Sequence, residues 1–310
     1  MKILISAPYM IRERQKVEKM FNGYDVDITW GKVLERLEEE ELLSIIENFD
    51  GLICGDDRLT QQVFDRAKKL KVIVKWGTGI DSIDSIAAKK RGISVFRTPN
   101  AFTEPVADST LGVILYFSRG IGINNKILKN GGWDKPRGFA LFERVVGIIG
   151  LGAVGTAVAK RLFPCGTTVL ANDIVEKPPD LLNKYKIQMV SKEEIFERAD
   201  IITLHCDLNT TSYHIINDKA FSKMINSPII INTARGPLIE ENSLIEALKG
   251  KVISGAGLDV FEDEPLPKNS PLREMDNVLL SAHNVNSSPA CWEYVHKNSV
   301  NMLVKGLNIG

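Results

Sequence analysis

The sequence predicts an α/β fold in which parallel β-sheets are covered by helices on both faces. Short runs of β-branched residues alternate with longer helical patterns along the whole chain, and these runs are continuously apolar rather than alternating. Strands of a parallel sheet are buried on both faces, so they read as continuous apolar runs. The length of 310 residues indicates roughly two domains of this kind.

The first half of the chain contains four predicted strands, at 3–5, 51–54, 72–74 and 93–96. A helical pattern with one buried stripe is expected between the first two, where Leu34, Leu37, Leu42, Ile45, Ile46 and Phe49 recur at helical spacing. The glutamates among them are expected to form its solvated face.

The second half repeats the alternation more strongly, with predicted strands at 145–149, 167–170, 201–204, 229–231 and 278–280. No linker rich in Pro, Ser or Gly separates the halves, so the chain is expected to cross between domains along helices. The crossings are predicted near 98–100 and after His283. This divides the chain into a discontinuous domain, 1–99 with 285–310, and an inserted domain, 100–284.

Composition and charge narrow the classes of function. The chain has 39 basic and 39 acidic residues, which gives a formal charge of zero. A neutral chain lacks the long-range field that attracts nucleic acid or anionic membranes, so we expect neither partner. No apolar run approaches the ~20 residues that cross a bilayer, and the apolar start of the chain is too short for a signal peptide.

The four cysteines, Cys54, Cys165, Cys206 and Cys291, are far apart in the sequence. No pair has the spacing of a zinc ribbon or a redox CxxC motif, and nothing suggests a disulfide framework. We therefore predict a protein of the reducing cytoplasm without a metal site.

The most specific local motif is the glycine turn Gly150-Leu151-Gly152-Ala153-Val154-Gly155, between a predicted strand and a predicted helix. The first glycine allows the tight turn, the second lets the backbone approach a pyrophosphate, and the third permits close packing of helix on strand. Amide groups at the helix start would bind the anion. The alternative is a turn that merely joins strand to helix.

Asp173 ends the next predicted strand, 18 residues beyond the last glycine. An acid about 20 residues on from such a turn accepts hydrogen bonds from the adenosine ribose. Its charge would repel a 2′-phosphate, so the position favours NAD over NADP, although Lys177 lies near enough to moderate this preference. Asp173 could otherwise be an ordinary turn residue.

Three later segments end apolar strands with reactive side chains, namely Arg235, Glu264 and His283. The carboxyl ends of strands in a doubly wound sheet face the ligand crevice, so the three are expected to converge on one bound molecule. The alternatives are a surface ion-pair arginine, a solvated glutamate and a structural histidine. His205, His214 and His296 lack such a context and are predicted to be structural.

With these motifs in order, the chain resembles the D-isomer-specific 2-hydroxyacid dehydrogenases, especially the phosphoglycerate dehydrogenase-like members. The resemblance covers nearly the whole chain and is carried by 75–84 (KWGTGIDSID), 98–100 (TPN), 106–108 (VAD), the glycine turn, 233–236 (TARG), 259–265 (DVFEDEP) and His283. It implies two doubly wound parallel-sheet domains, a Rossmann NAD-binding domain inserted into a flavodoxin-like substrate domain.

The resemblance also implies the roles of the reactive side chains. His283 would exchange the hydroxyl proton as general acid–base, because the unperturbed pKa of histidine, about 6.5, suits this task. Glu264 would hold its imidazole, and the planar cation of Arg235 would bind the substrate carboxylate and the developing alkoxide. Reduction of a keto acid should then weaken as the pH rises.

The remaining site residues follow from the same resemblance. Cofactor contacts are implied for Gly150, Gly152, Ala153, Val154, Gly155, Asp173, Cys206, Thr233, Ala234, Arg235, Asp259 and His283. Substrate contacts are implied for Lys75, Gly77, Thr78, Gly79 and Arg235. Cys206 could equally be a small buried filler.

The chain departs from the family pattern beside the histidine, where Ala282 replaces a usual proline and Asn284–Ser288 replaces a small Gly/Ala-rich stretch. Cys206–Asn209 also differs from the usual threonine- and proline-rich version. These changes remove no proton-transfer group, but they leave the substrate open.

The leading hypothesis is an NAD-dependent D-2-hydroxyacid dehydrogenase acting on 3-phosphoglycerate and 3-phosphohydroxypyruvate. A phosphate would need cations near 77–79, for which Lys75, Arg58 and Arg97 are candidates. The alternatives are a glyoxylate or hydroxypyruvate reductase and, in another class, an NAD(H)-sensing corepressor-like binding protein. The end at Gly310 predicts no regulatory domain. A homodimer is expected from the family, and 111–117 could supply its interface or be core.

Overall fold

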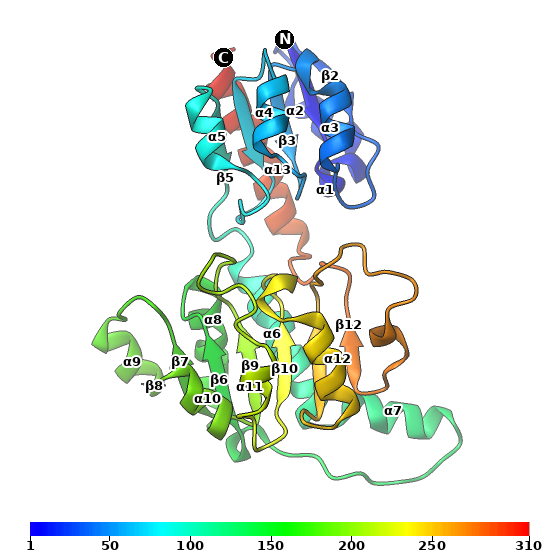
Figure 1. The fold of residues 1–310 in the computed structure, drawn as a ribbon, viewed down its shortest axis with the longest axis vertical. Coiled ribbons are helices and arrows are strands. Elements are labelled where there is room, and N and C mark those ends of the chain that lie inside the picture. Colours follow the sequence, from blue (N-terminus) through cyan, green and yellow to red (C-terminus); the bar gives the residue numbers. More distant parts are fainter. Residues whose placement is uncertain (310) are drawn as a thin grey trace. The chain divides into compact units, whose positions relative to one another are not determined.

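The computed structural model describes residues 1–309 and forms two compact units (Figure 1). Unit 1 comprises Met1–Phe102 together with the chain from Ser287 onward, and unit 2 comprises Thr103–Asn286. The predicted fold class, two α/β units with parallel sheets and one unit inserted into the other, is confirmed.

Unit 1 is built on a five-stranded parallel sheet. In spatial order its strands are β2 (Asp27–Trp30), β1 (Lys2–Ile5), β3 (Gly51–Cys54), β4 (Val72–Lys75) and β5 (Ser94–Arg97). Its helices are α1 (Pro8–Arg12), α2 (Arg14–Met20), α3 (Glu39–Ile45), α4 (Gln61–Arg66), α5 (Ser85–Lys90) and α13 (Pro289–Leu307), with a 3-10 turn η1 (Ile46–Asn48). The order 2-1-3-4-5 is that of flavodoxin-like sheets.

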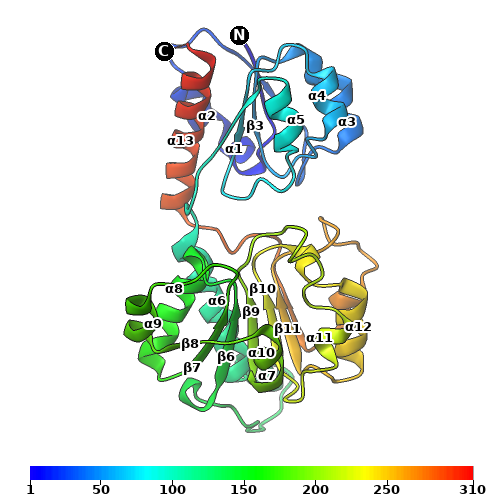
Figure 2. The ribbon, with the colours of Figure 1, turned by 60° about the vertical axis from the view of Figure 1, so that its left-hand side comes forward.

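Successive side chains of the unit 1 strands point to opposite faces, and each face has its own core. Leu4, Leu52 and Ile73 pack with α3, α4 and α5, whereas Ile3 and Ile53 pack with α13 and the first two helices. Figure 2 shows α13 alongside this sheet. Both faces being covered explains why the strands read as continuous apolar runs.

The helix predicted over 34–49 is shorter in the structure, because α3 begins only at Glu39. Glu38 and Glu41 form a reciprocal capping box that fixes this start. Leu34 precedes the helix and is 76% exposed, so its inclusion in the buried stripe was wrong. Leu37 is buried, but in the loop before the helix rather than in it.

Asp57 is fully buried, and its side chain anchors the loop that contains Leu37. Its carboxylate accepts a hydrogen bond from the amide of Leu37 at 2.9 Å and another from the hydroxyl of Ser6. Burial raises the pKa of Asp57 to about 6, although these hydrogen bonds oppose the shift. The folded chain therefore binds this proton more tightly than the unfolded chain does.

We expect the free energy of unfolding to reflect this difference. A raised pKa stabilises the fold below pH ~4, where both states are protonated, and this advantage is lost as the pH rises to about 6. As the pH rises from 3 to 7, the free energy of unfolding of Asp57→Asn should therefore increase by about 3 kcal/mol relative to that of the parent chain. Urea unfolding of both proteins across this range measures the difference, and a constant difference would contradict it.

Unit 2 is built on a seven-stranded parallel sheet. Its strands, in spatial order, are β12 (Val278–Leu280), β11 (Gly255–Leu258), β10 (Ile229–Asn232), β9 (Ile201–Leu204), β6 (Val145–Ile149), β7 (Thr168–Asn172) and β8 (Ile187–Met189). Its helices are α6 (Thr103–Ser118), α7 (Ile121–Lys129), α8 (Ala153–Leu162), α9 (Pro179–Tyr185), α10 (Lys192–Arg198), α11 (Asp218–Phe221) and α12 (Glu241–Lys249). The 3-10 turns are η2 (Leu141–Glu143), η3 (Phe163–Cys165), η4 (Gly236–Leu238) and η5 (Pro271–Glu274).

The two faces of this sheet are covered by different helices. Helices α6 and α8 pack on one face against residues such as Ile148 and Ile231. Helices α10, α11 and α12 pack on the other against Ile202 and Ile230. Through residue 309, no helix has the length and apolar character needed to span a membrane.

Candidate active site

The glycine turn joins β6 to α8, and two of its three glycines are required by close packing. Gly150 has a φ of +94°, and a Cβ there would lie 2.4 Å from the amide nitrogen of Cys206. A Cβ on Gly155 would lie 2.1 Å from the carbonyl oxygen of Gly150. Gly152 instead borders open space, since no atom lies within 4 Å of the position of its Cβ.

This open space lies at the first turn of α8. Ala153 and Val154 begin the helix, so their amide groups have no acceptor within it. The helix dipole adds a partial positive charge at the same place. The free space and the unsatisfied donors together fit the pyrophosphate of a dinucleotide.

Asp173 follows β7, at the strand edge where the glycine turn lies. Its carboxylate accepts hydrogen bonds from the amides of Leu151 at 2.7 Å and Val175 at 2.8 Å, and it pairs with Lys177 at 2.9 Å. Burial opposes ionisation, but these three donors lower the pKa of Asp173 below its usual range. The group is therefore a fixed carboxylate suited to accepting hydrogen bonds from ribose hydroxyls.

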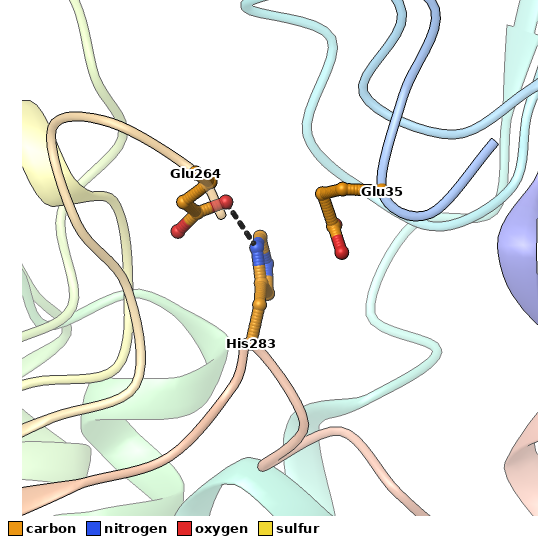
Figure 3. Close-up of side chains that lie close together, drawn as sticks. All are labelled: Glu35, Glu264 and His283. Carbon is orange, nitrogen blue, oxygen red and sulfur yellow. Dashed lines mark hydrogen bonds and ion pairs between the residues drawn. The ribbon is translucent and has the colours of Figure 1, made fainter. Parts of the chain in front are cut away.

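His283 and Glu264 form a hydrogen-bonded pair, with 2.9 Å between Nδ1 and Oε2 (Figure 3). The other carboxylate oxygen of Glu264 accepts from the amide of Phe261 at 3.0 Å. Both side chains are largely shielded from solvent. In a carboxylate–histidine pair of this kind, Nε2 is the ring nitrogen that exchanges a proton with a substrate.

The backbone around His283 is held by Asp259. The His283 amide donates to the Asp259 carbonyl at 2.7 Å, and the carboxylate of Asp259 accepts from the amides of Asn284 and Val285. Asp259 is buried, and burial raises its pKa despite these hydrogen bonds. These contacts maintain His283 at a φ of +46°, which L-residues rarely adopt. Ala282, which precedes this histidine, cannot restrain the backbone as a proline would, so these hydrogen bonds provide the restraint.

Arg235 follows β10 and is braced by Asn232, at the end of that strand. The Asn232 side chain donates to the Arg235 carbonyl at 2.8 Å and accepts from the Ala234 amide at 3.1 Å. The guanidinium itself donates to the Ala234 carbonyl at 2.9 Å. Thr233 is buried, with its hydroxyl 3.2 Å from that of Thr110. Sequence reasoning missed Asn232, although a polar residue ending a buried strand was a signal.

The sheet topology explains how Arg235, Glu264 and His283 come to one edge. They follow β10, β11 and β12 respectively, and these three strands are neighbours. Since all pairings are parallel, the three carboxyl ends lie at the same edge of the sheet. Segments that are widely separated in the sequence are thereby collected within unit 2.

In unit 1, the segment 77–79 forms a turn after β4. Gly77 has a φ of +118°, which favours glycine. The Thr78 hydroxyl donates to the Thr98 carbonyl at 2.9 Å, and Arg97 donates to the Thr78 carbonyl at 3.0 Å. Within residues 1–309, the amides of Thr78 and Gly79 donate to no protein carbonyl. A turn with free amides fits an anionic ligand.

Lys75 precedes this turn but points into the protein. Only 4% of the residue is exposed, and its ammonium group lies 3.1 Å from the carboxylate of Asp56. It also donates to the Trp76 carbonyl at 3.4 Å. A lysine buried and paired in this way is a structural cation in the observed conformation.

Burial keeps the side chains of Cys206 and His205 in unit 2 uncharged. Burial raises the pKa of Cys206 to about 11, so its thiol stays protonated. Burial lowers the pKa of His205 to about 3, and its ring is hydrogen-bonded to the Thr203 hydroxyl at 2.9 Å. In unit 1, His296 accepts from the indole of Trp76 at 2.9 Å in the core.

A dinucleotide-binding turn and a carboxylate-backed histidine in one α/β unit define an NAD-dependent oxidoreductase. Comparison with known sequences specifies the class further. The sequence profile described as "D-isomer specific 2-hydroxyacid dehydrogenase, NAD binding domain" matches residues 111–284. The chain belongs to the D-isomer-specific 2-hydroxyacid dehydrogenase family.

Named relatives differ in their substrates. The chain is 40% identical over 251 residues to a glyoxylate reductase of Thermofilum pendens, with 79% of this chain and 74% of that protein covered. It is 40% identical over 256 residues to a D-3-phosphoglycerate dehydrogenase of Methanocaldococcus jannaschii, covering 81% of this chain but only 48% of that protein. A hydroxypyruvate reductase of Thermotoga maritima is 35% identical over 280 residues, covering 89% and 87%.

Solved structures agree with this family. The TT0316 protein of Thermus thermophilus has a TM-score of 0.82 and 33% identity, covering 99% of this chain and 97% of that one. The D-lactate dehydrogenase of Aquifex aeolicus, solved with NAD and lactic acid, has a TM-score of 0.87 and 25% identity, covering 99% and 96%. The predicted cofactor, NAD, is thus confirmed at the level of the family.

Proposed function

We propose that the protein reduces a short 2-keto acid without a phosphate group, of the glyoxylate or hydroxypyruvate kind, to the D-2-hydroxy acid. The observation that carries this choice is the burial of Lys75 against Asp56. Of the three cations expected to bind a substrate phosphate, Lys75 is the nearest in sequence to the turn at 77–79. The proposal therefore departs from 3-phosphoglycerate, the leading sequence-based hypothesis.

The other two cations also have partners in unit 1. Arg97 donates to the carbonyl of Thr78, and Arg58 lies 4.0 Å from the carboxylate of Glu38. Phosphate recognition usually relies on Arg or Lys groups with donors directed at the oxygen atoms. A keto acid without a phosphate group needs only its carboxylate to be bound, so its recognition does not require these additional cations.

The residues of unit 2 suffice for the chemistry proposed. When bound, NADH supplies the hydride. His283 would donate a proton to the substrate carbonyl oxygen, and Glu264 would hold the ring through Nδ1. The guanidinium of Arg235 would stabilise the developing alkoxide and bind the carboxylate. The amides of 77–79 would provide further donors for the carboxylate.

A substrate panel tests the proposal. The purified protein with NADH is given glyoxylate, hydroxypyruvate, pyruvate and 3-phosphohydroxypyruvate, and kcat/KM is measured for each. We expect glyoxylate or hydroxypyruvate to exceed the phosphorylated acid by at least 10-fold. A preference for 3-phosphohydroxypyruvate would refute the proposal and restore the phosphoglycerate hypothesis. Binding of NADH without turnover of any keto acid would favour the NAD(H)-sensing alternative.

Asp173 should determine the preference for NADH over NADPH. Replacing it with Ala removes the acceptor for the ribose hydroxyls and leaves Lys177 without its partner, so we expect the Kd of NADH to rise about 10-fold and that of NADPH to fall. Fluorescence titration of each nucleotide measures both constants. Lys184→Gln, on the exposed side of α9, is the matched control. Equal changes for both nucleotides would contradict the role.

We also propose that the chain forms a homodimer through α7 and the segment after it. Helix α7 has no buried residue, and Ile121, Ile123 and Leu128 are each 53% exposed. Trp133 is 81% exposed. Segment 111–117 packs partly against its own core instead. Sedimentation of the parent and of Ile123→Glu tests this proposal. We expect the parent to be a dimer and the variant a monomer, and a monomeric parent would refute the proposal.

A further inference from the structure

We propose that His214, which the sequence marked only as structural, is a positioning residue for Glu264 and Arg235. It joins the loops that carry these two side chains, so that Glu264 meets His283 at hydrogen-bonding distance. This inference rests on the function proposed above for Glu264 and His283, and it concerns contacts within unit 2 only.

His214 touches three segments at once. Its ring nitrogen Nε2 lies 2.5 Å from the carboxylate of Glu262, in the loop after β11. Its amide donates to the carbonyl of Pro237 at 2.9 Å, in the turn η4 that follows Arg235. Its own carbonyl accepts from the side chain of Asn217 at 2.9 Å, at the start of α11. One residue therefore connects the loops after β9, β10 and β11.

The loops after β10 and β11 are packed so closely that a shift in one displaces the other. A Cβ on Gly236 would lie 1.9 Å from the carbonyl oxygen of Phe261 and 2.6 Å from the amide nitrogen of Glu262. That amide also donates to the carboxylate of Glu241, at the start of α12, at 3.4 Å. Arg235 directly precedes Gly236, and Glu264 follows Glu262 by two residues.

The loop after β11 depends on such anchors because residues 261–265 belong to neither a helix nor a strand. Within the loop, Glu264 is tied to the amide of Phe261. Glu262 provides a side-chain anchor to another segment through His214. The side chains of His214 and Glu262 are only 23% and 32% exposed, so this pair is better shielded from solvent than a surface ion pair.

The conformation of His214 supports a role beyond filling space. Its φ is +50°, an uncommon value for a residue other than glycine. The ring stacks on Tyr213, with centroids 3.9 Å apart and planes 19° from parallel. An uncommon backbone conformation persists when the surroundings hold it, as the Pro237, Glu262 and Asn217 contacts do here.

Single and double variants test the inference with NADH and glyoxylate. His214→Asn tolerates the same backbone conformation but is too short to reach Glu262, whereas His214→Gln keeps a donor at that reach. We expect His214→Asn to lower kcat about 10-fold with the Kd of NADH changed less than twofold, and His214→Gln to recover most of kcat. Glu262→Ala removes the acceptor of the same contact, so it should resemble His214→Asn and serves if that variant does not fold. Lys223→Gln removes an exposed ion pair of the same unit and is the control.

Measuring the effect of His214→Asn in the Glu264→Gln variant distinguishes a positioning role from a general effect on stability. Because His214 is proposed to act in part through Glu264, His214→Asn should cause a clearly smaller loss of kcat in that background than in the parent. An equal loss in both backgrounds, or no loss in the parent, would overturn the inference while leaving the proposed function intact. If Glu264→Gln itself leaves kcat unchanged, the proposed role of Glu264 fails and the inference fails with it, whereas the substrate panel still decides the proposed function.

Discussion

Replacing His283 with Ala should lower kcat for keto-acid reduction by roughly 10³-fold, because the variant lacks the imidazole that is proposed to deliver the proton. Glu264 accepts from the opposite ring nitrogen and cannot replace the imidazole. The parent enzyme should also slow as the pH rises, since only the protonated ring can donate, and this dependence should disappear in the variant. Steady-state rates across pH measure both effects.

The control for His283→Ala is binding of NADH, which should be nearly unchanged because the glycine turn and Asp173 remain. His205→Gln is the matched histidine control, since His205 is neutral and hydrogen-bonded to Thr203. Near-normal turnover of His283→Ala with intact NADH binding would show that the proton comes from elsewhere.

Replacing Arg235 with Lys should lower kcat/KM by roughly 10²–10³-fold although the charge is kept. The guanidinium has a planar set of donors that can bind a carboxylate and an alkoxide together, and it is also anchored on the Ala234 carbonyl. An ammonium group on a flexible four-carbon stem lacks both properties. Kinetics with glyoxylate and hydroxypyruvate measure the loss.

Thermal unfolding provides the control for Arg235→Lys, because the Asn232 bridge to the backbone does not involve the guanidinium and should keep the turn in place. A folded variant with unchanged kcat/KM would remove Arg235 from the proposed mechanism. A variant that recovers activity at high substrate concentration would indicate a role in ground-state binding alone.

The sequence predicted the central strands of both sheets because their residues are buried on both faces. It missed β2 and β8, which lie at sheet edges and carry partly exposed residues. An edge strand gives a continuous apolar run only where its residues are apolar, as in β12 (VLL) but not in β2 (DITW) or β8 (IQM). The helix expected from Leu34 failed for another reason, since periodicity alone did not reveal that Asp57 holds Leu37 in a loop.

The candidate site, too, could be predicted from the sequence only in part. Arg235, Glu264 and His283 could be placed at one edge because each ends a strand, and the parallel order of β10, β11 and β12 does collect them there. The partners of these residues could not be predicted. Neither the pairing of Lys75 with Asp56 nor that of His214 with Glu262 leaves a periodic signal, since both join segments distant in the sequence.

The most direct measurement follows the hydrogen itself. Hydroxypyruvate is incubated with the protein and with NADH that carries deuterium at the transferable position, and the glycerate formed is analysed for label and configuration. A nicotinamide-dependent D-2-hydroxyacid dehydrogenase must give D-glycerate with deuterium on its C2 carbon, and His283→Ala must form it far more slowly. Unlabelled glycerate, the L-isomer, or equal rates from both proteins would contradict the account.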